Sequence, residues 1–132
     1  MNPIVISATT PHHPGPTLFR GWLVPDTAGL LGIDQRWPAD PDNEEDGDQV
    51  WLITHLPTGR GIAYGSWTRA TTQEQAAAMA QRFYAEWTAR GWDLSSADFA
   101  SLRAPYLELT DRERGEFWDA VCAEATETEG AP

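Results

Sequence analysis

Residues 50–91, VWLITHLPTGRGIAYGSWTRATTQEQAAAMAQRFYAEWTARG, contain the pattern that decides the fold. Two runs rich in β-branched and aromatic residues, VWLITHL at 50–56 and GIAYGSW at 61–67, are separated by PTGR. Two such runs around a short turn that contains Pro and Gly are typical of a β-hairpin. The sequence therefore predicts a hairpin over residues 50–67.

The first strand of this hairpin has apolar residues on both faces. Trp51, Ile53 and His55 alternate along one face, and the residues between them on the other face are also mostly apolar. A strand of this kind is buried on both sides, so we expect 50–56 to lie in the centre of the sheet.

A helix is predicted directly after the hairpin. Thr71 and Glu74 have the spacing of a capping box, no Gly or Pro interrupts residues 73–90, and Gly91 suits the left-handed position that ends a helix. Trp92 follows and is expected to fold back on the last turn. The apolar residues recur at helical spacing and predict one buried face: Ala76, Met79, Ala80, Phe83, Tyr84 and Trp87.

The remaining segments give weaker patterns. Residues 3–7 and 18–24 are predicted as strands, and TAGLLGI at 27–33 as one irregular helical turn. A short helix is expected over 96–103, ended by Pro105.

The last helix is predicted from a second capping box. Thr110 and Glu113 have the required spacing, and the apolar residues of 111–125 mark one buried side. These apolar residues are Phe117, Trp118, Val121, Cys122 and Ala125. Residues 126–132 are expected to be a frayed tail.

These elements predict an α+β fold. A small antiparallel sheet of three to four strands, including the hairpin 50–67, should pack against helices 72–90 and 111–125. With 132 residues, 41% of them hydrophobic, the chain fits a single domain over 1–132 with an acidic loop at 38–49.

The negative charge is concentrated in two places. Residues 40–48 carry six acids and no base, a charge of −6, and residues 105–132 carry eight acids and two arginines, again −6. The remainder has six acids and seven arginines, or +1, which completes the net charge of −11. Such fields attract basic surfaces and repel nucleic acid, so we expect a protein partner with a basic surface and no direct binding to nucleic acid.

The expected partner-binding residues follow from this layout. Trp37 stands beside the first acidic stretch, and an aromatic anchor ringed by charge is typical of an interface hot spot. The set is Trp37, Asp40, Asp42, Glu44, Glu45, Asp46, Asp48, Glu113 and Glu116. The competing interpretation is that the acids only keep the protein soluble, and that Trp37 packs its own loop onto the domain.

Metal and cofactor sites are not expected. Placing Gly47 at the sixth position of an EF-hand loop puts acids at positions 1, 3 and 5, but Ile53 then occupies the twelfth position, where a bidentate Glu is required. His12 and His13 are adjacent and cannot easily aim at one ion, and His55 belongs to the predicted central strand.

Catalytic residues are not expected either. The chain contains no Lys, and its single cysteine, Cys122, belongs to the apolar side of a predicted helix. Ser66 lacks the glycine pattern and the strand-to-helix turn of a nucleophile elbow. These observations argue against an enzyme.

The segment VWLITHLPTGRGIAYGSWTRATTQEQAAAMAQRF at 50–83 resembles the strand, turn, strand and helix layout of the arm-binding domains at the start of tyrosine recombinases. The resemblance covers about a quarter of the chain and implies the local shape. In that family the sheet face carries basic and aromatic contacts to DNA, whereas here only Arg60 and Arg69 flank the hairpin.

We therefore expect a small, acidic, non-enzymatic protein-binding module in the cytoplasm, with no membrane association. Small acidic proteins of phages and mobile elements that inhibit host defence, including anti-CRISPR proteins, are similar in this general sense, because a carboxylate array that mimics DNA can compete for a nucleic-acid-binding surface. The alternative is a structural or assembly protein that forms a homodimer or larger oligomer through Trp-rich faces. A small enzyme or metal-binding protein is the third possibility.

Overall fold

The computed structural model describes most of the chain. The described residues are 1–8, 15–36, 50–63, 70 and 72–130. Side chains are described throughout these ranges except for Arg36, Val50, Ala63 and residues 123–130.

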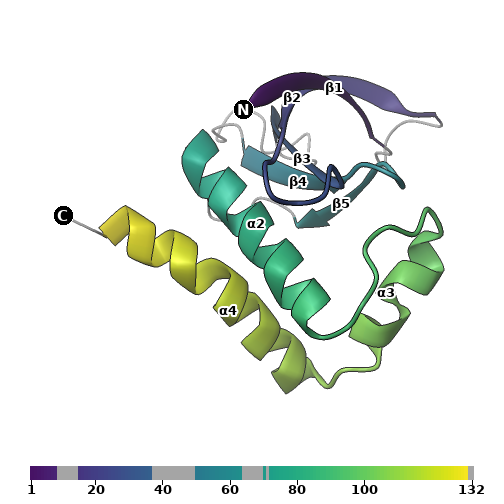
Figure 1. The fold of residues 1–132 in the computed structure, drawn as a ribbon, viewed down its shortest axis with the longest axis vertical. Helices are drawn as coiled ribbons and strands as arrows, with labels where there is room; N and C mark the ends of the chain where they lie inside the picture. The colour runs from purple at the N-terminus through teal and green to yellow at the C-terminus, as the bar shows by residue number, and fades with distance from the viewer. Residues whose placement is uncertain (9–14, 37–49, 64–69, 71, 131–132) are drawn as a thin grey trace, which may run out of the picture.

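Five antiparallel strands form one sheet in which each strand pairs with the next in sequence (Figure 1). The strands are β1 Asn2–Ala8, β2 Thr17–Leu23, β3 Leu31–Arg36, β4 Val50–His55 and β5 Arg60–Ala63. The predicted α+β class and antiparallel sheet are confirmed, with five strands instead of three to four. The strand that was not predicted is β3.

The helical turn predicted over 27–33 is wrong. Asp26, Ala28 and Gly29 all have positive φ and form a tight connection after β2, and β3 then begins at Leu31. The strand is stabilised by its pairing with β4 along its whole length. This pairing depends on a neighbour far along the chain, which local propensity does not reveal.

The sheet is strongly curled. A Cβ on Gly21 would lie 2.6 Å from Ile6 Cδ1 and 2.5 Å from the carbonyl oxygen of Ile33, and a Cβ on Gly59 would lie 2.7 Å from the carbonyl oxygen of Ser7. The turn after β4 therefore approaches the end of β1, and glycine is required where the backbones come close. The concave face buries Ile6, Ala8, Asp34, Leu52 and Thr54.

Helix α2, Gln73–Ala89, covers the convex face of the sheet and confirms the predicted helix 72–90. Its N-cap is Thr72, whose hydroxyl oxygen accepts from the N–H of Gln75 at 3.2 Å, so the capping position lies one residue later than predicted. At the other end Gly91 has φ +79°. The N–H of Gly91 bonds to Thr88 and that of Trp92 to Trp87, which is the Schellman pattern.

Two further helices complete the fold. Helix α3, Phe99–Leu107, begins later than predicted and continues past Pro105. Proline removes the hydrogen bond to the carbonyl of Ser101, and because Ser101 is exposed, water can take the place of the missing donor. Helix α4, Asp111–Gly130, is longer than the predicted 111–125. Of the helices described, none is both long and apolar enough to cross a bilayer.

Helix α2 lies between the sheet and α4 (Figure 1). Toward the sheet its side chains contact the face that carries Ile33, Trp51 and Ile53, and toward α4 the ring of Phe83 meets Phe117 edge-on at 5.6 Å. The strand β4 is thus buried on both faces, as predicted for a central strand.

Candidate functional site

Most of the predicted partner-binding residues lie outside the described part of the chain. These are Trp37, Asp40, Asp42, Glu44, Glu45, Asp46 and Asp48. The structure does show where their segment, residues 37–49, is attached: Arg36 at the end of β3 pairs with Val50 at the start of β4. The acidic stretch is therefore inserted between two neighbouring strand ends.

Glu113 is described, and it holds the start of α4. Its Oε1 accepts from the backbone N–H of Thr110 at 2.9 Å, and its own N–H donates to Thr110 Oγ1 at 3.2 Å. These reciprocal bonds are the predicted capping box. The bond from the Thr110 N–H is the main reason that the pKa of Glu113 is lowered, with a smaller contribution from the positive charge of Arg90. Glu113 is thus an ionised, exposed carboxylate whose hydrogen bonds with Thr110 cap the start of α4.

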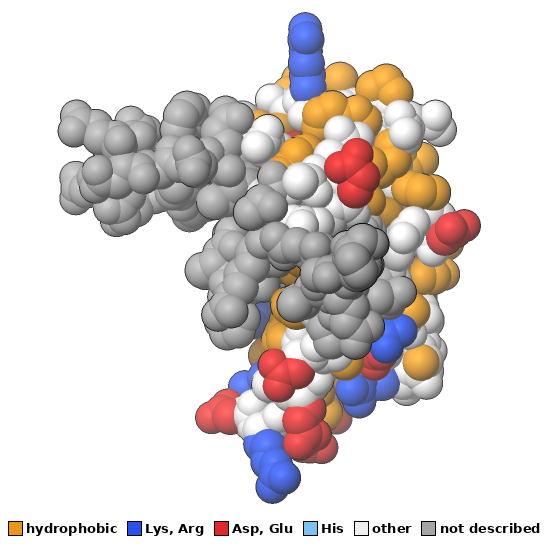
Figure 2. Space-filling view, turned by 90° about the vertical axis from the view of Figure 1, so that its left-hand side faces the viewer, with side chains coloured by type: hydrophobic (Ala, Val, Ile, Leu, Met, Phe, Trp, Pro, Cys, Tyr) orange, Lys and Arg blue, Asp and Glu red, His pale blue; other side chains and the backbone are white. Residues whose placement is uncertain are grey.

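Glu116 is exposed and paired on the same helix. Its Oε1 lies 3.2 Å from Arg112 Nε, and Asp111 forms a second pair with Arg114 at 3.2 Å. Acidic and basic side chains are correspondingly mixed at the lower end of the surface in Figure 2. The described first half of α4 is therefore less negative than the acid count alone suggests.

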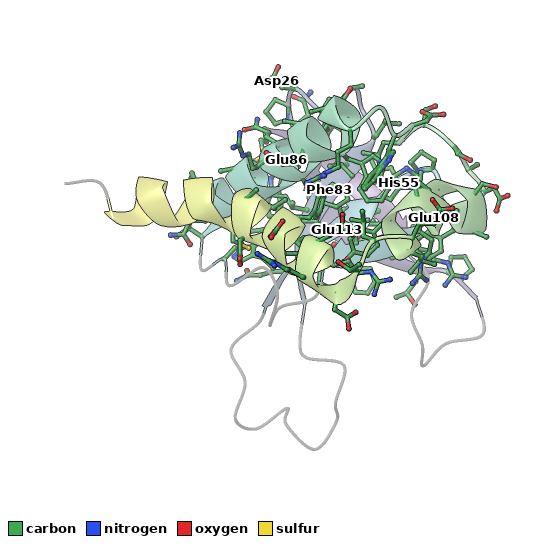
Figure 3. The ribbon with its side chains drawn as sticks, turned by 90° about the horizontal axis from the view of Figure 1, so that it is seen from below. Asp26, His55, Phe83, Glu86, Glu108 and Glu113 are labelled. Atoms are coloured by element: carbon green, nitrogen blue, oxygen red, sulfur yellow. The ribbon has the colours of Figure 1, made fainter. Side chains whose placement is uncertain are left out.

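His55 is fully buried between the sheet and the helices (Figure 3). Its Nε2 lies within hydrogen-bonding distance of the carbonyl oxygen of Leu94, and its Nδ1 is 2.9 Å from Thr58 Oγ1. Because a carbonyl only accepts, Nε2 carries the proton and Nδ1 of the neutral ring accepts from the threonine hydroxyl. Burial lowers the pKa of His55, and the bond to Leu94 partly opposes that shift. Both ring nitrogens are therefore used in structural bonds.

The other predicted chemistry-bearing residue, Cys122, is half-buried against the hydrophobic core. This agrees with the packing role expected from its position on the helix. In the part of the chain with described side chains, no three His, Cys, Asp or Glu residues are grouped to hold a metal ion.

The tryptophans that the structure describes pack inside the chain. Trp51 and Trp87 are buried, and Trp22, Trp92 and Trp118 are half-buried against the same core. Trp92 meets Trp87 edge-on at 4.9 Å, as expected from its position after the terminating glycine. Trp37 and Trp67 are outside the described residues.

Sequence reasoning missed the contacts between arginines and aromatic rings. Arg60 and Arg103 both lie over the ring of Phe99, and Arg90 lies over Phe117 at 5.3 Å. No spacing along the chain indicates such contacts, because they join residues from different elements.

No protein-family model, no curated protein and no solved structure matches this chain. The function is therefore inferred from the chain's own residues.

Proposed function

We propose that this protein is a small non-catalytic binding module whose acidic run, residues 38–49, binds a basic surface on another protein. The observation that carries the proposal is the pairing of Arg36 with Val50, which connects both ends of the run to adjacent strands. One of these strands, β4, is buried on both faces. Six carboxylates are thus attached to a rigid part of the fold, which limits the entropy lost when a partner binds.

The charge layout of the described body supports the same proposal. Arg82 pairs with Glu86 at 3.4 Å, and the two pairs at the start of α4 neutralise Arg112 and Arg114. These arginines offset acids of the body itself. The acidic run, by contrast, carries −6 without any arginine, and this charge can steer a basic partner toward the run.

The finer proposal is that the partner's surface normally holds nucleic acid. Six of the nine residues 40–48 are acidic, and none of them is basic. Concentrated negative charge of this kind suits an arginine- and lysine-lined groove that otherwise binds phosphates. This is the chemistry of a DNA mimic, as in the inhibitors of host defence carried by phages and mobile elements.

The proposal is tested by affinity capture with two variants of equal net charge. Glu44→Arg with Glu45→Arg reverses charge in the acidic run, and Glu74→Arg with Glu108→Arg makes the same change at exposed positions of the body. The wild type and the body variant should retain a basic protein that duplex DNA displaces, and the run variant should lose it. Equal capture by both variants would contradict the proposal.

The alternative of an oligomer formed through Trp-rich faces loses support from the packing, because the described tryptophans fill the chain's own core. Gel filtration with light scattering separates the two functions. A stable oligomer that persists unchanged at high salt would favour assembly, since apolar interfaces are little affected by screening.

A further inference from the structure

Two arginines from distant parts of the chain meet at one aromatic ring. The guanidinium carbon of Arg60, at the start of β5, lies 4.9 Å from the centroid of the Phe99 ring, and that of Arg103, on α3, lies 5.1 Å from it. The two guanidinium carbons are therefore at most about 10 Å apart. Both arginines are exposed, and Phe99 is half-buried.

Neither arginine forms an ion pair with a carboxylate among the described residues. This separates them from Arg82, Arg112 and Arg114, each of which has an acidic partner within 4.0 Å. Asp98 stands next to Phe99 in the chain, but its carboxylate accepts from the Ala100 N–H at 3.2 Å and from Ser101 Oγ at 2.7 Å. A cluster of two positive charges thus remains on a strongly acidic protein.

One buried group bonds both to the hairpin turn that carries Arg60 and to the segment that precedes α3. Arg60 pairs with His55 across the β4–β5 hairpin, and its N–H donates to Thr58 Oγ1 at 3.3 Å. His55 in turn bonds to both Thr58 and Leu94, and Leu94 lies in the segment that leads into α3. The hairpin turn and the connection before α3 are therefore bonded to one imidazole, which helps to hold the two elements in register, as a preorganised binding site requires.

We propose that Arg60, Phe99 and Arg103 form a binding site for the phosphate group of a small ligand, such as a phosphate monoester. Each guanidinium offers a planar fork of N–H donors that matches a phosphate oxygen pair. A phosphate monoester carries a charge of about −1.5 to −2 at neutral pH, which two guanidinium groups can balance, whereas a single carboxylate needs only one. The ring of Phe99 keeps the two cations together through cation–π contacts.

The net charge of the protein favours a small ligand over a long polyanion at this site. With a net charge of −11, a long polyanion such as duplex DNA is repelled, whereas a small ligand interacts mainly with the local arginine pair. The site lies on β5 and α3, away from the carboxylates of the acidic run in sequence, and it does not depend on the function proposed for that run.

The test is calorimetric titration of the full chain with adenosine monophosphate and with inorganic phosphate, using adenosine as the uncharged control. We expect saturable binding of the two phosphate compounds at millimolar concentration or below and no binding of adenosine. Arg60→Gln with Arg103→Gln should weaken binding by about tenfold or more, because two charge-assisted contacts are lost. The matched control, Arg20→Gln with Arg112→Gln, changes two other exposed arginines and should leave the affinity unchanged.

A second variant tests the role of the ring. Phe99→Leu keeps an apolar side chain that can fill the same space but removes the π-face, so phosphate binding should weaken while the circular dichroism spectrum and the melting temperature stay close to wild type. The proposal is overturned if neither phosphate compound binds at about 10 mM, or if both arginine double variants bind equally well. Binding of a single-stranded oligonucleotide without binding of adenosine monophosphate would also overturn it.

Discussion

The imidazole of His55 on β4 hydrogen-bonds to the backbone carbonyl of Leu94, 39 residues further along the chain. This bond joins the end of β4 to the connection between α2 and α3. The ring is fully buried, so the bond is made in a region from which water is excluded. Burial favours the neutral imidazole, whose Nε2 donates to Leu94 while its Nδ1 accepts from Thr58.

His55 should therefore make the stability depend on pH. Because its pKa is lowered from 6.5, its contribution is fully present above about pH 6.5 and is lost as the pH falls below that value, where the unfolded chain binds a proton that the folded chain does not. Urea unfolding at pH 7.5 and pH 5.5 measures the loss. In His55→Gln, which keeps an amide donor but does not titrate, this part of the pH dependence should disappear. An equal pH dependence in wild type and variant would show that other groups cause it.

Phe117 should be among the most sensitive positions of the helix layer. It is fully buried and meets Phe83 and Trp118 edge-on at 5.6 Å and 5.4 Å. Phe117→Ala should lower the free energy of unfolding by about 3–5 kcal/mol, because it leaves a cavity between α2 and α4. Leu107→Ala is the control at a 46% exposed apolar residue and should change it by less than about 0.5 kcal/mol. Chemical denaturation of both variants measures the difference.

Two glycines should respond in opposite directions to alanine. At Gly21 a Cβ would meet the backbone carbonyl of Ile33, so Gly21→Ala should destabilise the curled sheet by about 1–3 kcal/mol. At Gly115, inside α4, a Cβ meets nothing within 4 Å, so Gly115→Ala should stabilise the protein by about 0.5–1 kcal/mol. A melting temperature of Gly21→Ala at or above that of the wild type would contradict the described path of the sheet.

The structure and the sequence pattern assign the N-cap of α2 to different residues. Thr72→Ala removes the hydroxyl that accepts from Gln75, and the free energy of unfolding should fall by about 1 kcal/mol. Thr71→Ala removes the residue that the sequence pattern favours as the cap and should have a smaller effect. If the two results were reversed, the helix would begin one residue earlier than observed.

The sequence predicted most clearly the elements whose ends have local chemical signals. The capping box of Thr110 and Glu113 and the terminating Gly91 mark helix ends through hydrogen bonds between residues close in sequence, and the structure shows all of them. The hairpin was predicted for the same reason. By contrast, β3 depends on pairing with β4, and the curl of the sheet depends on close contacts such as Gly59 with Ser7. Neither the strand β3 nor the curl of the sheet is marked by a pattern of neighbouring residues in the sequence.

The predicted site was readable from the sequence only in part. The net charge of −6 in residues 105–132 favours an acidic surface at Glu113 and Glu116, whereas their spacing is that of a capping box and of an i,i+4 ion pair, and those are the contacts that the structure shows. The meeting of Arg60 and Arg103 at Phe99 could not be predicted, because it results from the packing of α3 beside the hairpin.

The central claim, that the acidic run binds a basic surface, is tested most directly by the salt dependence of the dissociation constant for the captured partner. We expect the wild-type Kd to rise by about tenfold between about 50 and 200 mM NaCl, and Glu44→Arg with Glu45→Arg to weaken binding at low salt and to flatten this dependence. A Kd that is the same for wild type and variant, with the same salt dependence, would contradict the claim.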